Sequence, residues 1–556
     1  MKKIKQLFLV TSAAALVLLV ADAEIKYCLA AIFIGVLIGI VLIPLVEKEA
    51  NGVAKIDRCL SVVFGSLICA VLSDVFYRTW FNHPYRMKDL AELIFTDYST
   101  AVRIFSILMA AIAIPSATAV FCLLVPVIRK AIQNEVLRRF SWTLLLKRCI
   151  LIVCCLVASA LVGYVLLVSV YLLPVDKIDE NVRQSAFTMQ KEGDFPTLSN
   201  WFTSDLDNYT DSIMLLEASE KRDVSAVVDA VNNPHGLIKD KYYAEVIVAH
   251  YIEDIPFDST FYYARYWHGY LVWLKPLLHF MEYNSIRAVN GVIQFVMVVC
   301  LCFLLVKKNL RKAIIPIILA YLMLMPVALA KSMQFSSCFY VFMIGSICLL
   351  LMDKRKLRES VFLVFLFIGV FTAYFDFLTY PISTFGVPAL IYLLLFETDD
   401  LGKKISDLLT NGFCWCLGYG GMWAEKWILA SIVTDDNIIK NAIRSIKERT
   451  GAVSIEGGGY FGVVSCEIEN YFAFLKTPVT LLAMAFCVVM VIKIIRERKP
   501  LRIISGQVVT PFVLVGLLPA VWYALALNHS SNHFWFTNKA CVTSFLAFLF
   551  GLVSLV

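Results

Sequence analysis

The sequence predicts an all-α integral membrane protein with about fourteen transmembrane helices. The chain of 556 residues is 60% hydrophobic and only 17% charged, with a mean hydropathy of +0.76, far outside the balance of soluble globular domains. Apolar stretches long enough to cross a hydrocarbon layer of about 30 Å recur along nearly the whole chain. These two observations exclude a soluble enzyme with a single membrane anchor.

The apolar stretches define the expected spans. The first one has a basic start and an Ala-x-Ala ending, as in a cleavable signal peptide, but we favour a retained helix. Another apolar run follows within a few residues, and cleavage would invert the charge pattern of the later loops. The expected spans are centred near residues 15, 37, 68, 115, 161, 296, 321, 345, 367, 390, 420, 485, 517 and 547.

Two long intervals between the spans divide the chain into parts. We expect an N-terminal region of four transmembrane helices at residues 1–148, and a transmembrane core at 149–430 that includes a long loop at 174–285. A second long loop follows at 431–475, and the C-terminal transmembrane helices occupy 476–556. The segment YYARYWHGYLVWLKPLLHFMEY of the first loop mixes aromatic residues with a few cations, which predicts a helix lying in the membrane interface.

The basic residues predict the orientation of the chain. Most Lys and Arg of the short loops lie in EKEANGVAKIDR, RKAIQNEVLRR, KKNLRK, DKRKLRE and KIIRERKPLR. The positive-inside rule places these loops and both termini in the cytoplasm, and both long loops on the extracytoplasmic side of the plasma membrane. The net charge of +7 therefore serves orientation. No basic surface interleaved with aromatic residues indicates nucleic-acid binding, so the expected partners include membrane lipids and no nucleic acid.

Cysteines and nucleotide motifs exclude several function classes. Most of the sixteen cysteines lie inside apolar runs, as Cys154 and Cys155 do, and none forms a CxxC pair. They indicate small buried side chains and neither a disulfide framework nor a metal site. No P-loop appears, and no dinucleotide-binding fingerprint appears in which a strand, a glycine-rich turn and a helix follow one another, which argues against a bound nucleotide.

Three carboxylates gather in the run DLDNYTD of the first long loop: Asp205, Asp207 and Asp211. Asp207 and Asp211 share one face if the run is helical. Like charges held close raise one another's pKa, and a carboxylate so tuned can take a proton from a sugar hydroxyl. Alternatively, Asp207 or Asn208 caps a helix that begins near Ser212. The two roles are compatible, and the spacing alone does not decide between them.

Other ionisable and aromatic residues are expected on the same side of the membrane. Charged groups at membrane depth are costly and often functional, although each one alone also fits an interfacial anchor. Two His in NHSSNH are four residues apart, but the Glu of H-E-x-x-H is missing, so hydrogen bonding or donation to phosphate is favoured over zinc binding. The candidate substrate-binding residues are Arg265, His268, Asp376, Tyr380, His529, His533 and Lys539.

Five motifs resemble those of an uncharacterised family of bacterial multi-pass membrane proteins usually grouped with GT-C-fold glycosyltransferases. They are LDNYTDSIML, RYWHGYLVWLKPLL, YFDFLTYPIS, GYGGMWAEKWILA and NHSSNHFWFTNKA. The resemblance runs from about residue 165 to the end and leaves out the first four spans. It implies a GT-C-like fold, in which a large extracytoplasmic loop with interfacial helices carries the active site.

The resemblance also implies a reaction. A sugar would pass from a polyprenyl-phosphate donor to an envelope glycan or glycolipid acceptor, with inversion of the anomeric centre. The general base would be Asp207 or Asp211, with Asp205 in reserve. In the family, acidic residues lie soon after a span, whereas DLDNYTD begins about thirty residues beyond one, so Asp176 and Asp179 stay candidates. Mg²⁺ or Mn²⁺ suits carboxylate and phosphate oxygens, but no coordination motif requires a metal.

Three other functions stay open. A transporter or a flippase for lipid-linked glycans would place ionisable residues and Gly/Pro breaks at mid-membrane, often in two matching halves, and the sequence has no internal repeat. A polysaccharide polymerase or ligase would share the donor class but usually has its large outer loop later in the chain. Only the clustered Asp and His residues argue against a non-catalytic subunit.

Overall fold

The computed structural model describes residues 142–221, 224–395, 400–434, 436–450, 453–455, 459–461, 463–496 and 506–555. The four spans expected near residues 15, 37, 68 and 115, and the two basic loops between residues 47 and 139, lie outside these residues. The same holds for the question of a cleaved or retained first helix.

The chain divides into two compact units. The smaller unit comprises Met1–Arg139, Thr450–Ile468 and Ala526–Ser531. Its described part contains an antiparallel pair of short strands, β3 (Val453–Ile455) and β4 (Gly459–Phe461). The larger unit comprises Phe140–Arg449, Glu469–Leu525 and Asn532–Val556, and the contacts of the candidate site lie within it.

The larger unit is mostly helical, and the prediction of a helical membrane protein is confirmed at that level. Among the described residues, six segments are long and apolar enough to cross a membrane, and they match the spans expected near 161, 296, 345, 485, 517 and 547. They are Leu146–Tyr171, Tyr283–Lys307, Met333–Leu351, Val479–Arg496, Val508–Leu525 and Phe534–Ser554.

The spans expected near residues 321, 367, 390 and 420 are helical but fall outside this set. The chain near 321 is interrupted, because α13 (Ile314–Met323) ends before Met325, which has a positive φ of 54°. A separate short helix, α14 (Pro326–Lys331), follows. The other three regions contain α16 (Lys354–Phe375), α17 (Ile382–Leu395) and α18 (Leu401–Val433). The total of fourteen spans therefore stays a prediction.

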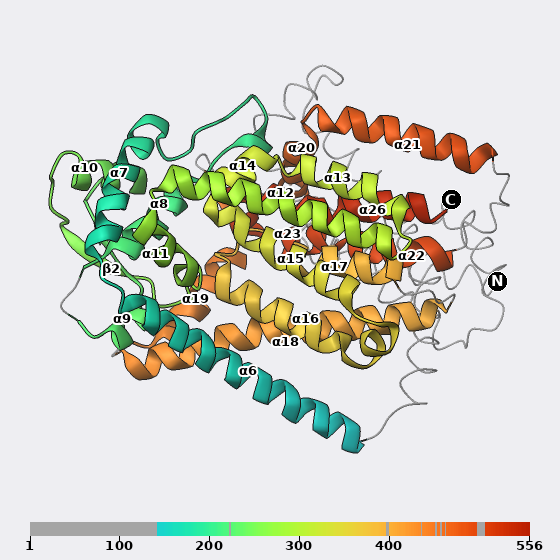
Figure 1. Cartoon of the computed structure of the whole chain (residues 1–556), viewed down its shortest axis with the longest axis horizontal. Helices are drawn as coiled ribbons and strands as arrows, with labels where there is room; N and C mark the ends of the chain where they lie inside the picture. The colour runs from blue at the N-terminus through green and yellow to red at the C-terminus, as the bar shows by residue number, and fades with distance from the viewer. Residues whose placement is uncertain are drawn as a thin grey trace, which may run out of the picture. The chain divides into compact units, whose positions relative to one another are not determined.

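Long helices of the larger unit lie side by side, with a polar subdomain at one end (Figure 1). We use this name for residues 174–282, which precede α12 (Tyr283–Lys307). α12 and α15 (Met333–Leu351) both begin at this end. The C-terminal part of the unit contains α20 (Val463–Leu475, which begins in the smaller unit), α21 (Val479–Arg496), α22 (Gly506–Gly516), α23 (Leu518–Leu525), α25 (Phe534–Thr537), η4 (Asn538–Cys541) and α26 (Val542–Ser554).

The polar subdomain contains a two-stranded sheet that the all-α prediction did not include. β1 (Pro234–Leu237) pairs antiparallel with β2 (Ser259–Tyr262), and α10 (Tyr243–Tyr251) lies between them in sequence. The other helices are α7 (Asp176–Glu192), α8 (Asn208–Ser219), α9 (Ala226–Asn232) and α11 (Leu271–Phe280). Two four-residue strands leave little alternation in the sequence from which to predict them.

The helix expected to lie in the membrane interface has a different environment. The segment begins at Tyr262, the last residue of β2, is irregular from Tyr263 to Tyr270, and then forms α11. Leu271, Leu274 and Leu278 are fully buried, and α11 packs against α6 (Trp142–Tyr171), α7 and α8. Its apolar face therefore belongs to the core of the polar subdomain.

Two basic loops meet at the end of the bundle opposite the polar subdomain. α12 and α15 both lead away from that subdomain, and the loops KKNLRK and DKRKLRE follow their C-termini. The Lys308 ammonium donates to the backbone carbonyl of Met352 over 3.0 Å. These two loops thus lie on one side and the polar subdomain on the other, the relative arrangement predicted from their charge.

α16 and α18 approach closely because each has a glycine at the crossing. A Cβ on Gly369 would lie 2.2 Å from the carbonyl oxygen of Trp415, and one on Gly418 would lie 2.0 Å from that of Leu366. Any larger residue would push the two backbones apart, as expected where small residues set helix packing in membranes. This crossing fixes the face of α18 that carries Trp415 and the aromatic residues after it.

Candidate functional site

Asp207 is the N-cap of α8. Its carboxylate accepts the backbone N–H of Thr210 over 2.9 Å and the Thr210 hydroxyl over 3.1 Å, and its side chain is buried. The capping interpretation of this residue is therefore confirmed, and the helix begins at Asn208, four residues before the expected start. A cap does not exclude proton transfer, but both carboxylate contacts hold the helix end.

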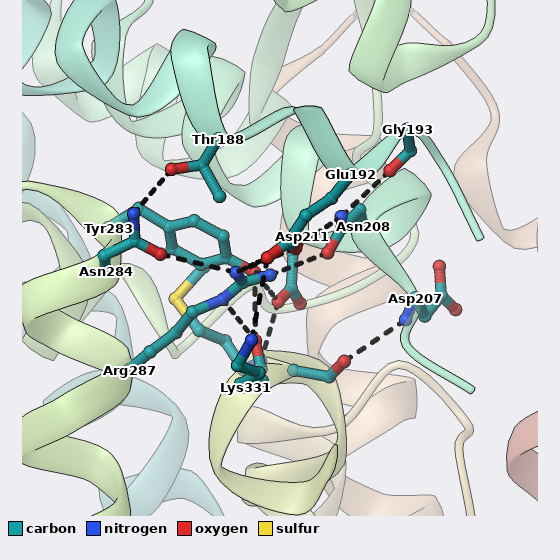
Figure 2. Close-up of polar contacts among 12 residues, drawn as sticks. Thr188, Glu192, Gly193, Asp207, Asn208, Asp211, Tyr283, Asn284, Arg287 and Lys331 are labelled. Carbon is teal, nitrogen blue, oxygen red and sulfur yellow. Dashed lines mark hydrogen bonds and ion pairs between the residues drawn. The ribbon is translucent and has the colours of Figure 1, made fainter. Parts of the chain in front are cut away.

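Asp211 lies one turn later and joins α8 to two other helices (Figure 2). Its carboxylate accepts the backbone N–H groups of Met333 at 2.8 Å and Gln334 at 3.0 Å, which are orphan donors in the first turn of α15. The Tyr283 hydroxyl of α12 also donates to it. The side chain is fully buried. All three donors favour a structural anchor at the start of α15.

Arg287 of α12 is the centre of the same network, and sequence reasoning did not single it out as a site residue (Figure 2). Its guanidinium donates to Glu192 at 2.9 and 3.0 Å, and to the Asn208 side-chain oxygen at 2.8 Å. Further bonds reach the Lys331 carbonyl at 2.7 Å and the Tyr283 hydroxyl at 3.1 Å. One buried cation thus ties the end of α7, the start of α8, the start of α12 and the chain before α15 together.

Burial decides the electrostatics of these carboxylates. It raises the pKa of Asp207 from 3.8 to about 7, against the lowering effect of the Thr210 bonds. It likewise raises the pKa of Asp211 from 3.8 to about 6, although Tyr283 and two backbone N–H groups lower it. Burial is the largest single effect on Glu192 and opposes its ionisation, but the charge of Arg287, the hydrogen bonds from Asn208 and Arg287 and the charge of Lys331 together outweigh it, so the pKa of Glu192 is lowered. Arg287 and Glu192 therefore form the charged part of the network.

The raised pKa of Asp207 predicts a pH dependence of stability. Between pH 3.8 and about 7 the unfolded chain loses this proton while the folded protein keeps it, so the free energy of unfolding falls as pH rises, by up to about 1.4 kcal/mol per pH unit. Asp207→Asn keeps the cap and should lack this part of the decline. Unfolding in detergent from pH 4 to 8 measures it. A wild-type-to-variant difference that stays constant across that range would contradict the raised pKa.

A second buried cluster surrounds Glu217 of α8. Its carboxylate lies 2.9 Å from Nδ1 of His268 and 3.5 Å from Nδ1 of His235, and the Tyr270 hydroxyl donates to it. Burial raises the pKa of Glu217, but the two imidazoles outweigh this and lower it. His268 has a positive φ of 53°, and its Nε2 donates to the Tyr263 carbonyl over 3.0 Å. The cluster fixes the irregular segment before α11, and His268, at 2% exposure, is not at a surface.

The YFDFLTYP candidates are buried beside this segment. Asp376 accepts the backbone N–H of Thr379 over 3.0 Å and also its hydroxyl, and Tyr380 donates to the Phe335 carbonyl over 2.5 Å. Both side chains therefore hold the turn between α16 and α17. The neighbouring Phe377 packs on His268 with ring centroids 4.9 Å apart.

The C-terminal candidates separate into two groups. Lys539 is fully buried and donates to the carbonyl of Thr203 over 3.2 Å, and its ammonium lies 4.4 Å from the centre of the Phe335 ring. Lys539, near the start of the last span, therefore contacts the chain two residues before the DLDNYTD run. His533 stacks on Phe536 within the same C-terminal segment. His529 belongs to the smaller unit.

Asp205 is the carboxylate of the run that is partly open. It is half-buried, whereas Asp207 and Asp211 are at 1% and 0% exposure. Burial raises its pKa, while the Thr197 side chain and the positive charge of Lys539 lower it, and the net direction is upward. A partly open carboxylate beside a buried ammonium has the properties of a proton acceptor next to an anion site.

Arg265 is not part of this group. Its guanidinium donates to the side-chain oxygen of Asn441 in α19 (Ile438–Thr450) over 2.7 Å and lies 5.6 Å from the centre of the Tyr263 ring. Among the described residues no set of three or more His, Cys, Asp or Glu is close enough to hold a metal ion. The chemistry that these side chains offer by themselves is proton transfer and anion binding.

An apolar groove lies between α15 and α16. Its volume is about 690 Å³, and α11 contributes Trp273 to its wall. Ile344 and Phe371 line it and are 51% and 46% exposed, so the groove is open to the surroundings of the helices. The remaining lining residues are Ser337, Tyr340, Val341, Gly345, Cys348, Val364, Phe367, Ile368 and Phe375.

Comparison of the chain with protein-family models, with curated proteins and with solved structures found no match. A functional assignment therefore depends on the residues of the site and their contacts.

Proposed function

We propose that the protein is a membrane glycosyltransferase of the GT-C type. It transfers a sugar from a polyprenyl-phosphate donor to an envelope glycan or glycolipid acceptor on the extracytoplasmic side. The polar subdomain and the start of the last span supply the reacting groups, and the membrane helices bind the lipid. A polar subdomain at one end of apolar helices matches the donor, because the donor has a long apolar tail and a polar reacting head.

The apolar groove between α15 and α16 is the observation that carries this proposal. Phe375 lines the groove, and Phe377, two residues later, packs on His268 in the polar subdomain. A lipid chain in the groove would therefore end close to His268 in the polar subdomain. The lining is almost entirely apolar and the volume lies in the range of pockets that bind small molecules, about 300–1,000 Å³. For a groove among membrane helices, a lipid chain is the matching occupant.

Asp205 and Lys539 are the reacting pair in this proposal. The acceptor hydroxyl oxygen forms a bond to the anomeric carbon while the bond from that carbon to the phosphate oxygen breaks. Asp205 takes the hydroxyl proton, and the charge of Lys539 stabilises the departing polyprenyl phosphate. Asp207 and Asp211 keep the run in place through their bonds to Thr210 and to α15. One displacement inverts the anomeric centre.

A transporter of lipid-linked glycans is the second candidate. The interruption between α13 and α14, with a positive φ at Met325, resembles the broken helices of transporters. Purified protein in liposomes distinguishes the two. The transferase requires a new glycosidic bond and the release of polyprenyl phosphate, whereas the transporter only moves the intact lipid between leaflets.

The groove provides a test of donor binding. Ile344→Trp fills the open side of the groove and should raise the KM for a polyprenyl-phosphate sugar roughly tenfold with little change in kcat, because only apolar binding is lost. The matched control is Val292→Trp on α12, which is 65% exposed and outside the groove lining. Equal KM values for the two variants would remove the groove from the donor site.

A further inference from the structure

Four aromatic residues form a ladder along α18: Trp415, Tyr419, Trp423 and Trp427. They follow one another at intervals of four residues, so they share one face of the helix. The centroids of successive rings are 5.0, 5.7 and 5.5 Å apart. The crossing of α16 and α18 at Gly369 holds this face against the neighbouring helix.

The two ends of the ladder differ from its middle. The indole N–H of Trp415 donates to the Thr384 hydroxyl over 3.0 Å, and that of Trp427 donates to the Arg265 carbonyl over 3.1 Å. The Tyr419 hydroxyl and the Trp423 indole N–H are buried, and neither has a hydrogen-bond partner among the described residues. Buried donors are nearly always paired in folded proteins. Two neighbouring unpaired donors therefore indicate a bound polar molecule that accepts their hydrogen bonds.

The surroundings of the two donors combine aromatic rings with charge. Tyr266 packs edge-on against Trp423 at 5.2 Å and against Phe377 at 5.7 Å. The charges of Asp376 and Arg449 both act on the Tyr419 hydroxyl. Apolar ring faces with a few fixed hydrogen-bond donors suit a ligand with C–H faces and hydroxyl groups.

We propose that Tyr419 and Trp423 form a sugar-binding subsite, in which their hydroxyl and indole N–H donate to sugar hydroxyl oxygens. The inference rests on the proposed function in one respect, namely that a lipid-linked sugar is available as ligand. The sugar comes from the donor or from the acceptor glycan. Both offer the same hydroxyl chemistry, and binding of a separate probe for each source distinguishes them.

The test uses purified full-length protein in a detergent without a sugar head group. The variants are Tyr419→Phe and Trp423→Phe, each of which removes an unpaired donor. Trp427→Phe is the matched control, because it removes the same indole but one whose N–H already has a protein partner. The probes are a short-chain polyprenyl-phosphate hexose, the same lipid phosphate without sugar, and a free envelope oligosaccharide. Calorimetric titration gives the dissociation constants, and circular dichroism gives the unfolding temperature.

The wild type should bind one of the two sugar probes, and both Phe variants should weaken that binding about tenfold while sugar-free lipid phosphate binds all proteins alike. Without ligand, Tyr419→Phe should unfold at the wild-type temperature or above it. Binding that is lost only for the oligosaccharide identifies the acceptor as the source and supports the subsite.

The opposite results separate two failures. If the variants bind both sugar probes like the wild type and also transfer the lipid-linked sugar like the wild type, the subsite is wrong and the proposed function stands. If the wild type binds no lipid-linked sugar but the oligosaccharide binds through Tyr419, the subsite stands and the proposed function is wrong. If Tyr419→Phe is less stable without ligand and sugar binding is unchanged, the donors hold structural water and the inference is overturned.

Discussion

Arg287→Met is expected to destabilise the larger unit by roughly 3–5 kcal/mol, the usual cost of removing one partner from a buried ion pair. The guanidinium is 3% exposed and donates to Glu192, Asn208, Tyr283 and the Lys331 carbonyl. Met fills a similar volume but leaves Glu192 with only the looser Lys331 ammonium, 3.7 Å away, and leaves the other acceptors without their donor. Thermal unfolding in detergent, followed by circular dichroism, measures the loss.

Two further variants give the result a specific meaning. Arg265→Met is the matched control, because Arg265 makes one exposed bond to Asn441, and we expect a change within about 0.5 kcal/mol. Adding Glu192→Gln to Arg287→Met removes the carboxylate charge that has lost its Arg287 partner. The double variant should therefore recover part of the lost stability, as coupled neighbours do. Equal stability of Arg287→Met and Arg265→Met would show that the network of Figure 2 does not hold the polar subdomain in place.

The spans could be predicted because their signal is local. An apolar run of sufficient length is visible without any knowledge of its neighbours, and six of the expected spans coincide with described helices. The interruption at Met325 was missed, because the apolar run continues through it in sequence. Pro326 disfavours the helical conformation at Met325 and is a local signal of the interruption, but it does not specify the positive φ of that residue.

The networks could not be predicted, because their members are distant in the chain. Glu192 and Arg287 are 95 residues apart, and Tyr270 and Glu217 are 53 apart. Arg287 lies near the start of an apolar span, where a cation usually anchors the helix in the membrane interface. The local sequence therefore does not indicate that it is the centre of a buried hydrogen-bond network. The partners of such residues emerge only from the packing of α7, α8 and α12.

The ladder on α18 is a signal that the sequence did contain. Trp415, Tyr419, Trp423 and Trp427 repeat every four residues, and this spacing by itself places them on one face of a helix. What the sequence lacks is the distinction between paired and unpaired donors. That distinction depends on Thr384 and the Arg265 carbonyl, which pair with the two ends of the ladder and leave its middle open.

The carboxylates of DLDNYTD likewise show that sequence spacing alone does not assign roles in the candidate site. A spacing of four residues between Asp207 and Asp211 suits a pair of tuned acids and equally suits a helix cap and its neighbour. The contacts separate the three residues, because Asp207 and Asp211 are occupied by Thr210 and by the first turn of α15. Asp205, the residue held in reserve, is the one that stays partly open and lies within the electrostatic reach of Lys539.

Asp205→Asn should therefore lower the rate of sugar transfer by about 10² to 10⁴, the usual contribution of a general base, with unfolding unchanged. The amide still accepts the bond from Thr197 but cannot take the acceptor's proton. The wild-type kcat should rise with pH through the raised pKa of Asp205, since the base acts when ionised, and the residual rate of the variant should lack that rise.

The control for this variant is Asp254→Asn, the same chemical change at a side chain that is 83% exposed and pairs only loosely with Arg183, over 3.6 Å. It should transfer at the wild-type rate. Asp211→Asn provides the contrast within the run, because an amide cannot accept all three donors that converge on Asp211, so stability should fall by about 1–3 kcal/mol. Its activity loss should then follow the loss of folded protein. If Asp205→Asn transfers normally while folded Asp211→Asn is inactive, the base is Asp211 and the anchor at α15 also performs the chemistry.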